Sequence, residues 1–122
     1  AKTIGTVIPE LAGKLDGMAA RVPVPDGSVV DLVVKLNSKP DAKAINQAVR
    51  AAAEGPMKGV LQYCEEPVVS SDIIGNPHSS VFDGLVTQAK GDGYARVLSW
   101  YDNEWGYSNR CVDIIRKAHT LN

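Results

Sequence analysis

The sequence predicts an α+β domain built on a mixed, largely antiparallel sheet with helices on one face. Three observations support this fold class. Short β-branched segments alternate irregularly with two helical patterns, tight turns separate them, and no regular βαβ repeat is present. The 122 residues amount to one domain, and an apolar fraction of 44% is enough for one core.

A β-hairpin is the first predicted element of the sheet. Residues 18–24 and 28–36 are rich in β-branched residues, and the Pro-Asp-Gly run at 25–27 between them is typical of a tight turn. Alternate residues of the second segment form an apolar face, namely Val30, Leu32, Val34 and Leu36. Further strands are predicted over residues 60–65, 79–82, 85–90 and 94–101, with a turn at 91–93.

Two helices follow from apolar residues at helical spacing. The first covers residues 42–53, with Ser38 as its cap and Asp41 near its positive end, and it stops at Gly55. The second starts after Asp102 or Asn103, either of which is suited to cap it. Its apolar stripe is predicted to face the core and comprises Tyr107, Cys111, Ile114, Ala118 and Leu121. A short amphipathic segment over residues 2–11 is interrupted at Pro9.

Charge and cysteine content exclude several classes of protein. With 13 basic and 14 acidic residues the net charge is −1, which gives no general footprint for nucleic acid. No apolar run is long enough to span a membrane, and no spacing of Cys and His fits a metal site. Cys64 and Cys111 are expected to be reduced thiols, which favours a cytoplasmic protein. The chain begins with Ala1 instead of methionine, so we expect a processed chain or a segment of a longer one.

Arg21 is the first candidate binding residue. It lies in a stretch that otherwise resembles a half-buried strand, where an unpaired guanidinium is costly. It either holds a phosphate or carboxylate through two parallel hydrogen bonds or forms a structural ion pair, and spacing alone favours the ion pair.

The second candidate is the aromatic corner at residues 100–107, which contains Asn103 and Tyr107. An amide among aromatic rings suits a ring-shaped ligand, but periodicity alone favours an ordinary strand-to-helix corner with core aromatics. His78, Cys64 and Cys111 lack the neighbours of a catalytic base or nucleophile, so the residues alone identify no reaction.

Three long runs carry a family resemblance. They are KLDGMAARVPVP at residues 14–25, SSDIIGNPHSS at 70–80 and LSWYDNEWGYSNR at 98–110. Together they resemble the C-terminal part of the catalytic domain of phosphorylating glyceraldehyde-3-phosphate dehydrogenase. The resemblance covers residues 1–122 in order.

The resemblance implies which groups this chain supplies. Arg21 matches the arginine that grips the phosphate of glyceraldehyde 3-phosphate, Asn103 the asparagine that hydrogen-bonds the nicotinamide carboxamide of NAD, and Tyr107 the tyrosine beside that ring. The Rossmann domain, the nucleophilic cysteine and its histidine base belong to the missing N-terminal portion. No catalytic residue is therefore assigned here, and the chain alone is expected to be inactive.

The implied reaction oxidises the aldehyde through a thiohemiacetal, passes hydride to NAD and lets inorganic phosphate cleave the thioester, giving 1,3-bisphosphoglycerate. The complete glycolytic enzyme would be a homotetramer. Two alternatives stay open. The chain is a non-catalytic structural or assembly fragment, or it is the equivalent part of an erythrose-4-phosphate dehydrogenase.

Overall fold

The structure is a computed structural model that describes residues 3–121. Lys2, the first residue of the predicted amphipathic segment, lies outside the described residues. The elements in chain order are α1 (Ile4–Val7), the 3-10 helix η1 (Pro9–Leu11), β1 (Ser28–Lys35), α2 (Ala42–Glu54), β2 (Leu61–Cys64), α3 (Ser70–Ile73), β3 (Ser80–Ala89), β4 (Tyr94–Tyr101) and α4 (Trp105–His119).

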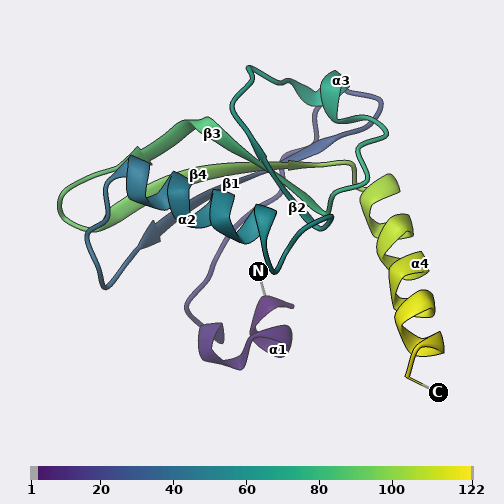
Figure 1. The fold of residues 1–122 in the computed structure, drawn as a ribbon. Coiled ribbons are helices and arrows are strands. Elements are labelled where there is room, and N and C mark those ends of the chain that lie inside the picture. Colours follow the sequence, from purple (N-terminus) through teal and green to yellow (C-terminus); the bar gives the residue numbers. More distant parts are fainter. Residues whose placement is uncertain (1–2, 122) are drawn as a thin grey trace.

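A four-stranded sheet in the order β1-β4-β3-β2 forms the centre of the fold. β4 pairs antiparallel with both β1 and β3, and β2 pairs parallel with β3. The prediction of an α+β fold with a mixed, largely antiparallel sheet is confirmed. Figure 1 shows α2 lying across one face of the sheet, and α4 projecting from the end of β4.

The predicted hairpin is wrong. Residues 18–24 form no strand, and β1 pairs instead with β4, from Ser28 opposite Tyr101 to Lys35 opposite Tyr94. Pro23 within this segment and Pro25 directly after it explain the difference, because neither has a backbone N–H to donate to a neighbouring strand. In addition, Val24 N donates to Val22 O across Pro23 at 2.9 Å, which bends the chain locally. β1 is instead tied to β4 by the two-pronged contact of Arg96 with the Asp31 carboxylate.

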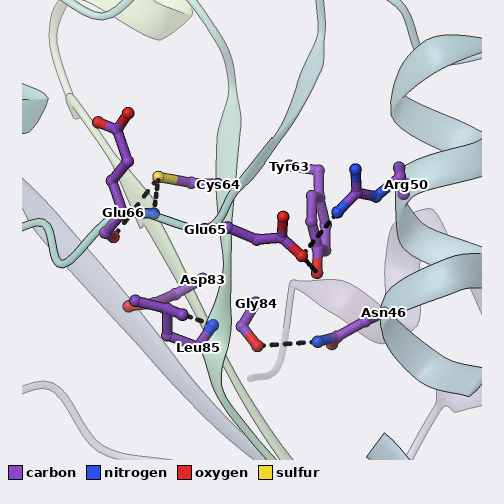
Figure 2. Close-up of polar contacts among 9 residues, drawn as sticks. All are labelled: Asn46, Arg50, Tyr63, Cys64, Glu65, Glu66, Asp83, Gly84 and Leu85. Atoms are coloured by element: carbon purple, nitrogen blue, oxygen red, sulfur yellow. Dashed lines mark hydrogen bonds and ion pairs between the residues drawn. The ribbon is translucent and has the colours of Figure 1, made fainter. Parts of the chain in front are cut away.

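The two short strands predicted over residues 79–82 and 85–90 are one continuous strand, β3. The register between β3 and β4 shifts between Asp83 and Gln88. This irregularity coincides with the break predicted between the two short strands. Asp83 is buried there, and its carboxylate accepts from Leu85 N at 3.1 Å and from Trp100 Nε1 at 3.2 Å. Figure 2 shows Asp83 and the adjacent Gly84, whose carbonyl accepts from the side-chain nitrogen of Asn46 of α2 at 2.8 Å.

The core lies between the sheet and the loop that contains α3. Ile73 and Val81 are each 1% exposed and pack with the buried thiol of Cys64, while Val68 and Trp100 close the cluster. Both cysteines are free thiols, as predicted.

Helix α2 has the predicted extent, but its cap is Asp41 and not Ser38. The Asp41 carboxylate accepts from Ala44 N at 2.7 Å, and Ser38 lies too far before the helix to reach a free N–H of the first turn. Arg50 of α2 pairs with Glu65 at 2.6 Å and stacks over the ring of Tyr63, whose hydroxyl also donates to Glu65 (Figure 2). The hydrogen bond from Arg50 lowers the pKa of Glu65, so the pair stays charged at neutral pH.

Helix α4 forms as predicted, but its apolar stripe does not face the core. Tyr107, Ile114 and Leu121 are 73%, 68% and 78% exposed, and Cys111 is only partly buried. The reason is the direction of the helix, which leaves the end of β4 and does not lie over the sheet (Figure 1). The spacing of the apolar residues therefore predicts the helix correctly, but the prediction that these residues are buried against the core is wrong.

Candidate functional site

The corner between β4 and α4 is organised by Asp102. This residue is 3% exposed, and its carboxylate accepts from Gly75 N at 2.8 Å, Glu104 N at 2.9 Å and Trp105 N at 2.7 Å. Burial raises the pKa of Asp102, but these backbone hydrogen bonds outweigh it and bring the pKa below the ordinary 3.8. A buried carboxylate thus binds the backbone where α4 begins and ties the loop at Gly75 to the corner.

Asn103 follows directly and is exposed. Its side-chain oxygen accepts a hydrogen bond from the hydroxyl of Ser28 at 3.0 Å, across 75 positions of sequence. With the oxygen engaged, the amide NH₂ is the group that remains to donate to a ligand. The N-cap residue of α4 is Glu104, so neither Asp102 nor Asn103 occupies the predicted capping position, although the Asp102 carboxylate accepts from Trp105 N, the first residue of the helix.

Tyr107 lies in the first turn of α4, four residues after Asn103, and exposes most of its side chain. The neighbouring Cys111 raises the pKa of the Tyr107 phenol above its ordinary 10.0, so the ring is neutral at physiological pH. Asn103 and Tyr107 therefore offer an amide donor and a flat apolar ring at one corner of the molecule.

Arg21 lies in the irregular segment before β1 and is exposed. Within residues 3–121 its guanidinium makes no ion pair, so the structural pairing that spacing favours is not formed there. In the same part of the chain no hydrogen bond links it to Asn103 or Tyr107. Arg21 precedes Ser28, the first residue of β1, by seven positions in the sequence.

His78 has a local structural role. The side-chain oxygen of Asn76 accepts from His78 N at 3.0 Å and lies 2.9 Å from His78 Nδ1, so the two residues close the turn around Pro77. Burial, and secondarily the charge of Arg110, lower the pKa of His78 below its ordinary 6.5. This agrees with the interpretation of a turn histidine and not of a catalytic base.

The candidate residues Arg21, Asn103 and Tyr107 do not line either of two hollows in the surface. An open hollow of about 460 Å³ lies over the core, between β2 and the α3 loop, and is lined among others by Gln62, Cys64 and Asn76. A smaller one of about 260 Å³ lies beside Arg50 and Tyr63. Over residues 3–121 no cluster of acidic, histidine and cysteine side chains is arranged to hold a metal ion. No helix in that range is long and apolar enough to cross a membrane.

Ser28 is the residue that sequence reasoning missed. The sequence predicts only that Ser28 belongs to a strand, and the predicted hairpin pairs that strand with residues 18–24. Its contact with Asn103 becomes visible once β1 is paired with β4, which sets Ser28 opposite Tyr101 and two positions from Asn103. A correct strand pairing would have been the only signal.

The fold and the corner define an α+β domain that exposes an amide and a phenol where β4 leads into α4. Comparison with known proteins gives the family. Residues 1–103 match the model described as "Glyceraldehyde 3-phosphate dehydrogenase, C-terminal domain". The chain belongs to this family.

Curated relatives agree over almost the whole chain. A glyceraldehyde-3-phosphate dehydrogenase of Mycobacterium tuberculosis is 57% identical over 115 residues, which are 94% of this chain and 34% of the relative. One of Borreliella burgdorferi is 56% identical over 119 residues, or 96% of this chain and 36% of the relative. A testis-specific one of Mus musculus is 55% identical over 116 residues, or 95% and 26%. The chain thus spans about a third of the length of the two bacterial relatives and about a quarter of the mouse relative.

Proposed function

We propose that residues 1–122 are the C-terminal portion of the catalytic domain of a phosphorylating, NAD-dependent glyceraldehyde-3-phosphate dehydrogenase. In this proposal the chain supplies contacts to the substrate phosphate and to nicotinamide, while the upstream portion supplies the Rossmann domain, the nucleophilic cysteine and its base. The observation that carries the proposal is the corner at Asn103, where an exposed amide and an exposed phenol are held one helical turn apart.

The residues of the corner fit the nicotinamide end of NAD. A carboxamide needs a directional hydrogen-bond partner, and the Asn103 NH₂ is available because Ser28 occupies the oxygen. A planar ring needs a flat apolar neighbour, and the neutral ring of Tyr107 is mostly exposed. Bound NAD would accept a hydride from the substrate. Asn103 would fix the plane of the carboxamide, and Tyr107 would restrict the positions open to the nicotinamide ring.

Arg21 would bind the phosphate of glyceraldehyde 3-phosphate. It has a planar fork of donors that matches phosphate oxygens, and no carboxylate in residues 3–121 competes for it. Its position in an irregular segment leaves it free to meet a substrate that the upstream portion holds. This chain therefore positions and neutralises charge, and the upstream portion makes and breaks the bonds.

The test joins residues 1–122 to the upstream two thirds of the mycobacterial relative and follows NADH absorbance with glyceraldehyde 3-phosphate and inorganic phosphate. We expect an active chimera. Arg21→Gln should raise KM for the aldehyde about tenfold or more, since hydrogen bonds to charged groups contribute about 1.5–3 kcal/mol, and should leave KM for NAD unchanged. Arg21→Lys should recover only part of the loss, because an ammonium cannot form the paired contact.

The matched control is Arg116→Gln in the last turn of α4, which removes an equal charge away from the corner and should leave both KM values unchanged. Erythrose 4-phosphate is assayed beside glyceraldehyde 3-phosphate, and a preference for the four-carbon sugar would reassign the substrate. A correctly assembled chimera that does not reduce NAD with either sugar would refute the enzymatic proposal.

A role in assembly is the second candidate, and a specific observation favours it. Both faces of β1 expose apolar side chains, including Val29, Val30, Leu32 and Val33. These would be covered in a homotetramer of complete subunits.

The free thiols of Cys64 and Cys111 are in keeping with a cytoplasmic location.

A further inference from the structure

The hydrogen bond between Ser28 and Asn103 joins two distant parts of the chain at the proposed nicotinamide contact. The Ser28 hydroxyl donates to the Asn103 oxygen at 3.0 Å, while Asn103 itself is exposed. An exposed asparagine normally samples several rotamers and both orientations of its amide. A single fixed donor on the oxygen selects one of them.

Both ends of this bond are anchored by backbone geometry. On one side, Ser28 is the first residue of β1 and is paired with Tyr101 of β4. It follows Gly27, whose φ of +90° and approach to Ser70 leave no room for a side chain: a Cβ there would lie 2.8 Å from the Ser70 carbonyl oxygen. Its pairing with Tyr101 and the close approach of Gly27 to Ser70 hold the backbone of Ser28 at the end of the sheet.

On the other side, Asn103 is fixed by its neighbour. Asp102 is buried and held by three backbone N–H groups, two of them in the start of α4. The Cα of Asn103 is thus set by the cap, and only its side chain is free to turn. Ser28 removes that remaining freedom.

We propose that Ser28 is a positioning residue for NAD: it holds the Asn103 amide with its NH₂ facing the ligand, so that Asn103 donates to the carbonyl oxygen of the nicotinamide carboxamide. This inference rests on the proposed function. Ser28 itself makes no contact with the reacting atoms, and its effect passes through Asn103.

The experiment measures binding, by calorimetry, to the chimera that joins this chain to the upstream part of a relative. Ser28→Ala should weaken NAD binding about two- to tenfold, the range expected for one net hydrogen bond. Binding of ADP-ribose, which lacks the nicotinamide ring, should not change. Ser28→Thr keeps the hydroxyl and should restore NAD binding.

Two further arms separate this role from a general structural one. Ser38→Ala removes an exposed serine whose hydroxyl makes no hydrogen bond within residues 3–121, and it should leave both affinities unchanged. The 3-acetylpyridine analogue of NAD keeps the carbonyl oxygen but lacks the amide nitrogen. Ser28→Ala should weaken its binding as much as that of NAD, because Asn103 donates to the oxygen.

The outcomes distinguish this inference from the proposed function. Equal losses for NAD and ADP-ribose, or no loss for either, would overturn the role of Ser28 while leaving the chimera a working dehydrogenase. An effect confined to NAD and absent with the acetylpyridine analogue would show the opposite amide orientation and would also overturn it. A chimera that binds no NAD at all would refute the proposed function, and the role of Ser28 with it.

Discussion

At the scale of single residues, Asp102 does the most to shape the corner. One buried carboxylate satisfies three backbone N–H groups that would otherwise lack partners at the start of α4 and in the Gly75 loop. The same contacts lower the pKa of Asp102, and the link between the loop and the helix therefore depends on its charge. The backbone position of Asn103 is therefore set by the contacts of its buried neighbour Asp102.

Asp102→Asn should destabilise the chain by about 1–3 kcal/mol at neutral pH, because an amide has one acceptor oxygen and cannot satisfy all three N–H groups. Urea denaturation monitored by tryptophan fluorescence measures the change. Asp16→Asn is the control: its carboxylate accepts only from the adjacent Gly17, and the expected change is close to zero.

The pH dependence of the same pair of proteins has a defined sign. Because the folded pKa of Asp102 lies below its ordinary 3.8, the carboxylate stabilises the fold fully above that value. This contribution disappears as the pH falls from 3.8 through the lower folded pKa. The difference in stability between wild type and Asp102→Asn should therefore shrink below about pH 4. A difference that stays constant down to acid unfolding would contradict this role.

At the scale of elements, Ile73 is the most deeply buried side chain that packs the α3 loop against the sheet. Ile73 is 1% exposed and packs with Cys64 and Val81, whereas the next residue, Ile74, is 47% exposed. The pair offers a chemically identical comparison, in which the same atoms are removed from a core position and from a surface position.

Ile73→Ala should cost about 2–5 kcal/mol of unfolding free energy, from lost burial and from the cavity left behind. Ile74→Ala should change stability by about 0.5 kcal/mol or less, as is usual at the surface. Denaturant midpoints of the two variants test this. Similar losses for both would mean that the α3 loop is not docked as the structure has it.

The elements also show how far local sequence determines the fold. Helix α2, strand β4 and the turn at 91–93 were predicted from spacing and turn residues, because those signals act within a few positions. The partner of β1 was not, because the Pro-Asp-Gly run marks a turn without stating that a strand precedes it, and β4 lies more than 55 residues further on. Pairing across that distance depends on contacts such as Asp31 with Arg96, which no local pattern contains.

The candidate site was predictable to a different degree. The family resemblance predicts binding roles for Arg21, Asn103 and Tyr107. Their residue patterns alone favour a structural ion pair and an ordinary strand-to-helix corner. The apolar stripe of α4 predicted a helix with a buried face, but periodicity cannot name the surface that covers that face. Ser28 was beyond reach until the strand order was known.

At the scale of the whole molecule, unpartnered apolar surface is the main property of the chain. Ile114 and Ile115 of α4 are 68% and 69% exposed, and Leu121, two residues after the helix ends, is also largely exposed. β1 adds exposed valines on both faces. Where exposed apolar side chains gather in this way, another segment or subunit often covers them. The chain spans about a third of its relatives, so the segments able to cover it would come from the other two thirds.

The chain by itself should therefore associate and bind a hydrophobic fluorescent dye, and the chimera with the upstream portion should bind much less dye per subunit. Replacing Ile114 and Leu121 together by glutamate should lower both dye binding and association of the isolated chain, because charge on the helix face opposes apolar contact. Met18→Glu, at an exposed apolar position outside α4, is the matched control and should have a smaller effect. Sedimentation velocity at several concentrations gives the association state. A compact monomer that binds no dye would mean that this surface needs no covering, and would remove the physical basis for an incomplete domain.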